Sequence, residues 1–91
     1  MNEIKLKEEG REIIRANGGS VFRRFLYSEG EVSFEVMTLV KRKIRIRFLS
    51  KGKYQLFLDN NLKRIFEGDS VEIEVPEGNH SVLILLIEKE R

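Results

Sequence analysis

Cationic residues repeat at every second position in the middle of the chain, and this spacing indicates one kind of binding chemistry. Lys43, Arg45 and Arg47 alternate with isoleucines. Alternate residues of an extended strand lie on the same face, so these side chains would form a cationic strip of the kind that meets the phosphate groups of nucleic acids. The candidate nucleic-acid or anion-binding residues are Lys43, Arg45 and Arg47, with Arg23 and Arg24 as an extension of the strip.

Acidic residues at matching positions support a second interpretation of the basic strip. In a hairpin between the acidic segment Glu31–Thr38 and the basic segment that follows it, matching the apolar faces places Glu35 opposite Arg45. Opposite charges in such positions stabilise a strand pair by about 0.2–1 kcal/mol, and Glu72 and Glu74 offer further partners on a later strand. The net charge is +2, from 17 basic and 15 acidic residues, a smaller excess than dedicated nucleic-acid-binding domains usually carry. Nucleic-acid binding is therefore an alternative hypothesis rather than the leading one.

Residues with catalytic or metal-binding chemistry are sparse in this sequence. The chain has one histidine, His80, and no cysteine, which excludes disulfides and thiolate metal sites within the chain. His80 and its neighbour Ser81 would point to opposite faces of a strand, so they do not form a nucleophile–base pair. The sequence contains no glycine-rich phosphate-binding loop and no nucleophile elbow. We therefore expect a protein that is not an enzyme, with no catalytic, cofactor-binding or metal-binding residues, and we interpret Asp59 as a turn residue rather than a Ca²⁺ ligand.

The elements that would position these residues are strands. Apolar and polar residues alternate in Glu31–Val36, Lys43–Phe48 and Ser70–Val75, which is the pattern of half-buried antiparallel strands. The predicted turns are Asn17–Gly19, Ser28–Gly30, Lys51–Lys53, Asp59–Asn61, Glu67–Asp69 and Pro76–Asn79. The sequence thus predicts a single all-β domain over residues 1–91, a small antiparallel β-sandwich or jelly-roll-like fold of about seven to eight strands.

The N-terminal third allows two interpretations. Residues Glu8–Asn17 could form a short helix that ends at the Asn-Gly pair, although Gly10 would weaken it by up to about 1 kcal/mol relative to alanine. The alternative is a hairpin of Glu12–Ala16 with Ser20–Tyr27. We favour the hairpin.

The last strand differs from the others because it is apolar on both faces. If Val82–Ile87 pairs with Val71–Val75 through the proline turn, its even-numbered residues join the core. Leu83, Leu85 and Ile87 then need a second cover. A central, fully buried strand would supply it, and so would an interface with a protein partner or a second copy of the chain. These three residues are the candidate protein interface, and no run of apolar residues is long enough to span a membrane.

Two segments carry a resemblance to a known kind of module. Gly52–Asn61 and Ser70–Val82 contain a strand that ends in an aspartate turn and a Pro-Glu-Gly-Asn-His turn that leads into an apolar strand. Over residues 52–87 the chain resembles small accessory β-sandwiches, namely PEGA-like domains and the carbohydrate-binding or galactose-binding jelly-roll modules. The resemblance implies a sandwich fold and an accessory role, but it carries over no ligand-binding residue. The chain also has no tryptophan, the residue best suited to stacking on sugars.

These observations rank three functions. The leading expectation is a non-catalytic binding or accessory module that acts through a protein interface; the alternatives are an electrostatic nucleic-acid-binding domain and a carbohydrate-associated module. The 35% of charged residues and the single glutamine resemble the composition of heat-adapted proteins. The N-terminus lacks the apolar region of a secretory signal, which favours a cytoplasmic location.

Overall fold

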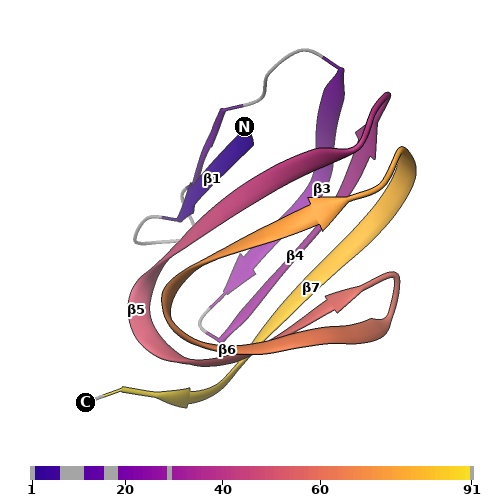
Figure 1. The fold of residues 1–91 in the computed structure, drawn as a ribbon. Coiled ribbons are helices and arrows are strands. Elements are labelled where there is room, and N and C mark those ends of the chain that lie inside the picture. The colour runs from indigo at the N-terminus through magenta and orange to yellow at the C-terminus, as the bar shows by residue number, and fades with distance from the viewer. Residues whose placement is uncertain (1, 7–11, 16–18, 29, 91) are drawn as a thin grey trace.

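The protein is all-β. The computed structural model describes residues 2–6, 12–15, 19–28 and 30–90, which form strands joined by short turns and contain no helix (Figure 1). The strands are β1 (Asn2–Leu6), β2 (Glu12–Arg15), β3 (Ser20–Ser28), β4 (Glu31–Thr38), β5 (Arg42–Leu58), β6 (Asn61–Val75) and β7 (Gly78–Lys89). The prediction of an all-β fold is confirmed, and no helix of the described residues is long and apolar enough to cross a membrane.

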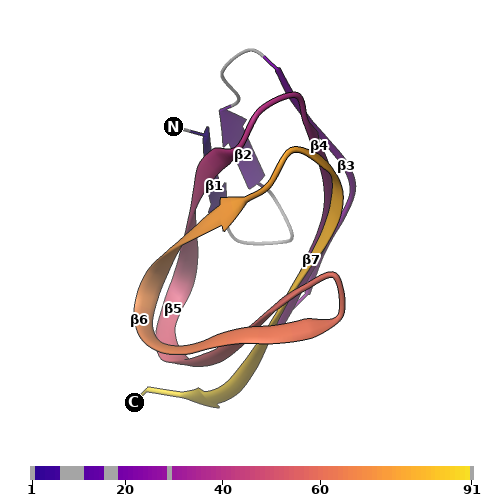
Figure 2. The same ribbon diagram turned by 45° about the vertical axis from the view of Figure 1, so that its right-hand side comes forward.

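All described strands belong to one mixed sheet. Six of them follow the order β2-β1-β5-β7-β4-β3, and β6 pairs with β5 beside this path. The strands β1 and β5 run parallel, whereas the other pairs are antiparallel. The sheet curls into a half-barrel (Figure 2). The arrangement therefore does not show the two separate sheets of the expected sandwich or jelly roll.

The curl is produced by the long hairpin of β5 and β6. The first half of β5 lies between β1 and the second half of β6, and its second half lies between β7 and the first half of β6. The register shifts between Arg47 and Gly52, and a shift of this kind bends a strand. The bend brings the β1–β5–β6 side of the sheet to face the β3–β4–β7 side, as Figure 2 shows. Across the bend of β6, Arg64 Nη1 donates a hydrogen bond to the carbonyl oxygen of Glu72 at 3.1 Å.

The hydrophobic core fills the concave side of the curled sheet. Its buried members come from five strands and are Ile4, Leu6, Val32, Phe34, Val36, Ile44, Ile46, Tyr54, Leu56, Val71, Ile73, Val75, Val82 and Ile84. The alternation in the sequence correctly predicted which residues of β4, the first half of β5 and the end of β6 point inward. Phe48, Tyr54 and Phe66 stack at the bend, with ring centroids of the first two 4.5 Å apart. The hydroxyl of Tyr54 donates to the carbonyl oxygen of Ser50 at 2.6 Å.

A β-bulge in β3 turns one additional aromatic residue inward. The register with β4 shifts between Arg23 and Leu26, and Arg24 has a positive φ of 53°. Because the bulge inserts a residue, Phe25 packs on the core side, where its ring stacks on Phe34 with centroids 5.6 Å apart. Leu26 faces outward and is 68% exposed. The bulge therefore exchanges the faces of two large apolar residues.

Two of the predicted turns are wrong. Lys51–Lys53 and Glu67–Asp69 lie inside the continuous strands β5 and β6. Gly52 provides close packing rather than a reversal: a Cβ atom there would lie 2.6 Å from the carbonyl oxygen of Glu88. The eight predicted runs consequently form six strands, β2–β7, and β1 is a strand that the sequence pattern did not predict. The tight turn at Asp59 and Asn60 is present, with positive φ at both residues.

The predicted strand partners also differ from those observed. The segment Glu31–Thr38 pairs with β3 and β7 instead of forming a hairpin with β5. The last strand pairs with β4 and β5 instead of Val71–Val75. Residues Glu12–Arg15 form a strand, as favoured, but its partner is β1 rather than Ser20–Tyr27. The remaining residues of the alternative helix, Glu8–Arg11 and Ala16–Asn17, lie outside the described residues. Alternation indicates which face a residue occupies but does not specify the neighbouring strand.

Candidate interaction surface

The outer, convex face of the sheet divides into two regions of different chemistry. On β1, the first half of β5 and the second half of β6, the outward residues are charged; we call this the charged region, and its members are Glu3, Lys43, Arg45, Arg47, Glu72 and Glu74. On β3, β7, the second half of β5 and the first half of β6 the outward residues are largely apolar; we call this the apolar region, and its members are Leu26, Phe57, Leu62, Ile65, Leu83 and Leu85.

Arg45 lies at the centre of the charged region, between two carboxylates. The register places it beside Glu3 on β1 and Glu72 on β6. Its Nη2 and Nε atoms donate to Glu72 Oε1 at 2.5 and 3.2 Å. This hydrogen bond raises the pKa of the Arg45 guanidinium and lowers the pKa of the Glu72 carboxyl group. The prediction that Glu72 would serve as an acidic partner is confirmed, whereas the predicted pairing of Arg45 with Glu35 is wrong.

Other basic residues near this strip also have acidic partners. Lys41 Nζ lies 2.5 Å from Glu74 Oε1, and the hydrogen bond between them raises the pKa of Lys41 and lowers that of Glu74. Arg47 Nε lies 3.7 Å from Glu3 Oε1. Lys43 lies opposite Glu74 in the β5–β6 register. The charged region is therefore a mixed ladder in which acidic and basic side chains alternate between strands.

Arg23 and Arg24 do not extend the strip on β5. They lie on β3, and the strands β4 and β7 separate β3 from β5 in the sheet. Arg23 Nε and Arg24 Nη1 lie 3.0 and 3.4 Å from the two carboxylate oxygens of Glu35. The structure therefore brings Lys43, Arg45 and Arg47 together on one strand and places the other two candidates elsewhere.

The apolar region spans five strands and is interrupted at β4, where the outward residue of the first row is Ser33. Cα register connects Leu26 to Ser33, Ser33 to Leu83, Leu83 to Phe57 and Phe57 to Leu62. A second row lies two residues further along the strands and runs through Glu31, Leu85, Gln55 and Ile65. With adjacent strands about 4.8 Å apart, the first row is about 19 Å wide.

Exposure within the apolar region is highest at its borders. Leu26 is 68% exposed, and Leu62 and Ile65 are each 50% exposed. Leu83 and Leu85 are half-buried at the centre, flanked by residues of β4 and β5. Ile87, the third predicted interface residue, lies at a register shift between β5 and β7 and is 49% exposed.

Sequence reasoning missed four of the six members of the apolar region. Phe57, Leu62 and Ile65 were assigned to strands but not to an interface. The signal was present, because Tyr54–Leu58 is apolar at four of its five positions and so on both faces, like the last strand. Leu26 gave no such signal, since its outward position depends on the bulge beside Arg24.

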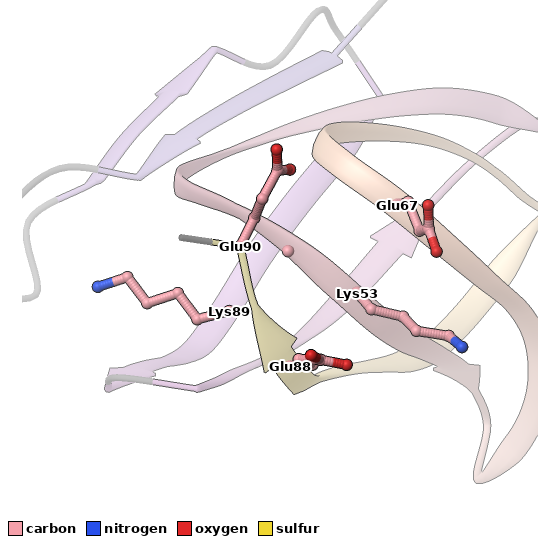
Figure 3. Close-up of a pocket in the computed structure, with 6 residues that line it drawn as sticks. Lys53, Glu67, Glu88, Lys89 and Glu90 are labelled. Atoms are coloured by element: carbon pink, nitrogen blue, oxygen red, sulfur yellow. The ribbon is translucent and has the colours of Figure 1, made fainter.

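A surface depression near the C-terminal end of β7 is lined by charged residues and one glycine. It has a volume of about 380 Å³ and is lined by Gly52, Lys53, Glu67, Glu88, Lys89 and Glu90. Figure 3 shows side chains of both charges around it. Within the described part of the chain, no group of three or more histidine, cysteine or acidic residues could hold a metal ion.

Asp59 and His80 form a linked pair at the end of the β5–β6 hairpin. Asp59 Oδ2 lies 2.6 Å from His80 Nδ1, and Asp59 Oδ1 accepts a hydrogen bond from the Ser81 backbone N–H at 2.9 Å. His80 Nε2 lies 3.1 Å from the carbonyl oxygen of Glu77. The hydrogen bond to Asp59 raises the pKa of His80, and its counterpart lowers the pKa of Asp59. Both ring nitrogens face acceptor oxygens, an arrangement that favours the doubly protonated imidazole. These contacts connect the β5–β6 turn to β7.

Comparison with known proteins finds no matching family model, no matching curated protein and no matching solved structure. The resemblance to PEGA-like domains therefore stays a prediction. The functional argument depends on the two regions of the outer face.

Proposed function

We propose that this protein is a non-catalytic interaction module that binds a protein partner through the apolar region of its outer face. The observation that carries the proposal is the row of Leu26, Leu83, Phe57 and Leu62 across the sheet, in which Ser33 of β4 is the one polar residue. Exposed apolar patches of a few hundred Å² on small proteins mark binding sites more often than chance. The core already occupies the concave side, so this second apolar face is not needed to fill the interior.

The charged region supports the nucleic-acid alternative less well. Four of the five residues predicted to bind nucleic acid, Arg23, Arg24, Arg45 and Arg47, lie within 4 Å of a carboxylate oxygen. A phosphate group would have to compete with these carboxylates. Of the aromatic residues near the basic strip in sequence, Tyr54 is buried in the core and cannot stack on a base.

The proposal is tested by mapping the binding surface with paired substitutions. Proteins retained by the immobilised chain would be identified and purified, and each affinity would be re-measured by calorimetry. Leu83→Lys should lower the affinity for a specific partner at least about tenfold, because it puts a charge at the centre of the apolar region. Lys43→Glu, a substitution of similar size in the charged region, serves as the matched control and should leave the affinity within about twofold.

The opposite pattern would refute the proposal. A partner that tolerates Leu83→Lys but is lost on Lys43→Glu would move the binding surface to the charged region. If the partner were a generic oligonucleotide whose affinity falls steeply with salt, the nucleic-acid alternative would replace the present one.

A further inference from the structure

We infer that the partner of the apolar region is a second copy of this chain, packed face to face about a two-fold axis that runs along β7. The inference rests on the proposed function, because it names the occupant of the same surface. The central strand β7 has two strands on either side within the apolar region, β4 and β3 on one and β5 and β6 on the other. A two-fold axis along β7 therefore lays β3 and β4 of one copy over β6 and β5 of the other.

The sizes of the outward residues match across this axis. Leu83 and Leu85 meet their own counterparts, and Leu26 meets Leu62 of the second copy. Ser33, the smallest residue of the first row, meets Phe57, the largest. A small residue opposite a large one is the arrangement that lets two sheet faces interdigitate at about 10 Å separation.

The charges at the borders of the apolar region are also complementary across the axis. On the β3–β4 border, Arg23 and Arg24 share the single carboxylate of Glu35, which leaves a net positive cluster, and Glu31 stands further along β4. On the opposite border, Asp59 is already paired with His80 and with the backbone N–H of Ser81. The charge there that faces a second copy is that of Lys63, which is exposed at the register shift of β6.

The axis along β7 exchanges the two borders without reversing the direction along the strands. Glu31 therefore comes near Lys63 of the second copy. By symmetry this unlike pair occurs twice, at two corners of the apolar contact. Such a rim favours one self-complementary orientation over others.

The oligomeric state of the full chain tests the inference. Sedimentation equilibrium from about 10 µM to about 1 mM covers the weak, transient range expected for an interface of this small size. The wild-type chain should show a monomer–dimer equilibrium. Leu83→Lys places two ammonium groups on the axis and should weaken the dimer about a hundredfold. Leu26→Lys changes a residue that is 68% exposed, so it should leave the fold intact, as circular dichroism would show, and weaken the dimer about tenfold.

A charge exchange tests the orientation. Glu31→Lys and Lys63→Glu should each weaken the dimer about fivefold, since each creates two like-charge contacts in the symmetric complex. The double variant restores the unlike pairs and should return the dissociation constant to within about twofold of wild type.

Three results would overturn the inference: a monomer throughout the concentration range, a dimer that tolerates both lysine substitutions, or a double variant that is weaker than either single variant. A monomeric chain that still binds another protein in a Leu83-dependent manner would remove the dimer and leave the proposed function in place. A monomeric chain without such a partner would remove both.

Discussion

The charged and apolar regions of the outer face share the long strands β5 and β6, but their side chains differ in whether they find partners within the molecule. In the charged region each arginine of β5 has a carboxylate of an adjacent strand within 4 Å, so the ladder is neutralised inside one molecule. In the apolar region the adjacent strands contribute more apolar residues, and Leu26, Leu62 and Ile65 remain at least half exposed. A surface that is satisfied internally has little to gain from a partner, whereas exposed apolar area gains about 25 cal/mol for each Å² that is buried. By this energetic criterion the basic strip, the most conspicuous feature of the sequence, gains less from a partner than the apolar region does.

Gly52 lies in β5 between the charged and apolar regions. Of the substitutions considered, its replacement should lower the stability of the fold the most. In Gly52→Ala the new Cβ would lie 2.6 Å from the Glu88 carbonyl oxygen and 2.7 Å from Leu86 Cδ1. The carbonyl belongs to the backbone of β7 and cannot move aside, so we expect a loss of about 3 kcal/mol of unfolding free energy, measured by urea denaturation. Gly68→Ala is the control, because no atom lies within 4 Å of its Cβ position. Its positive φ alone should cost about 1 kcal/mol. Equal losses in the two variants would show that the close approach at Gly52 is unimportant.

Removing the acidic partners should convert the charged region into a nucleic-acid-binding surface. The double variant Glu72→Gln and Glu74→Gln frees Arg45 and Lys41 from their carboxylates. We expect its affinity for a generic oligonucleotide to exceed that of the wild-type chain about tenfold, with a salt dependence steeper by about two phosphate contacts. Fluorescence anisotropy at several salt concentrations measures both quantities. A wild-type chain that already binds as tightly as the double variant would show that the ion pairs do not neutralise the region.

The Asp59–His80 pair predicts a smaller effect that depends on pH. The pKa of His80 is raised above 6.5 and that of Asp59 is lowered below 3.8, in each case chiefly by their mutual hydrogen bond. The stabilisation associated with His80 is therefore fully present below pH 6.5 and is lost as pH rises through the raised pKa. The stabilisation associated with Asp59 is present above pH 3.8 and is lost as pH falls through the lowered pKa.

Because His80 is the only histidine of the chain, its ring protons can be followed directly by NMR. The titration should give a pKa above the value of 6.5 for an unperturbed histidine. In the wild-type chain the unfolding free energy should fall as the pH rises through the pKa of His80. In His80→Gln this fall should be absent. A histidine that titrates below 6.5, or a stability that rises between pH 6.5 and pH 8, would contradict the geometry of the pair.

The sequence predicted which face of the sheet each residue occupies better than it predicted which strands lie side by side. The reason is physical. Val32, Phe34 and Val36 follow the two-residue period of a strand, which is a local property, and they are buried as expected. The pairing of β4 with β7 joins residues at least 40 positions apart, and nothing in the local pattern distinguishes it from a hairpin with β5. Gly52 was misinterpreted because a glycine that permits a turn and a glycine that permits close packing look alike in sequence.

The sequence predicted only part of the candidate site, for the same physical reason. Leu83 and Leu85 were identified because a strand that is apolar on both faces has more apolar area than one core can bury. Leu62 and Leu26 could not be identified in the same way. Their outward positions depend on the register of β6 and on the bulge at Arg24, and both are properties of the assembled sheet.

The distinction between the two regions is tested most directly by recording amide NMR spectra of the full chain as its concentration is raised. We expect concentration-dependent shifts at outward residues of the apolar region, led by Leu83 and Leu85, and unchanged signals at Lys43, Arg45 and Arg47. Shifts centred on the three basic residues, or spectra that do not change at any position up to about 1 mM, would contradict the account.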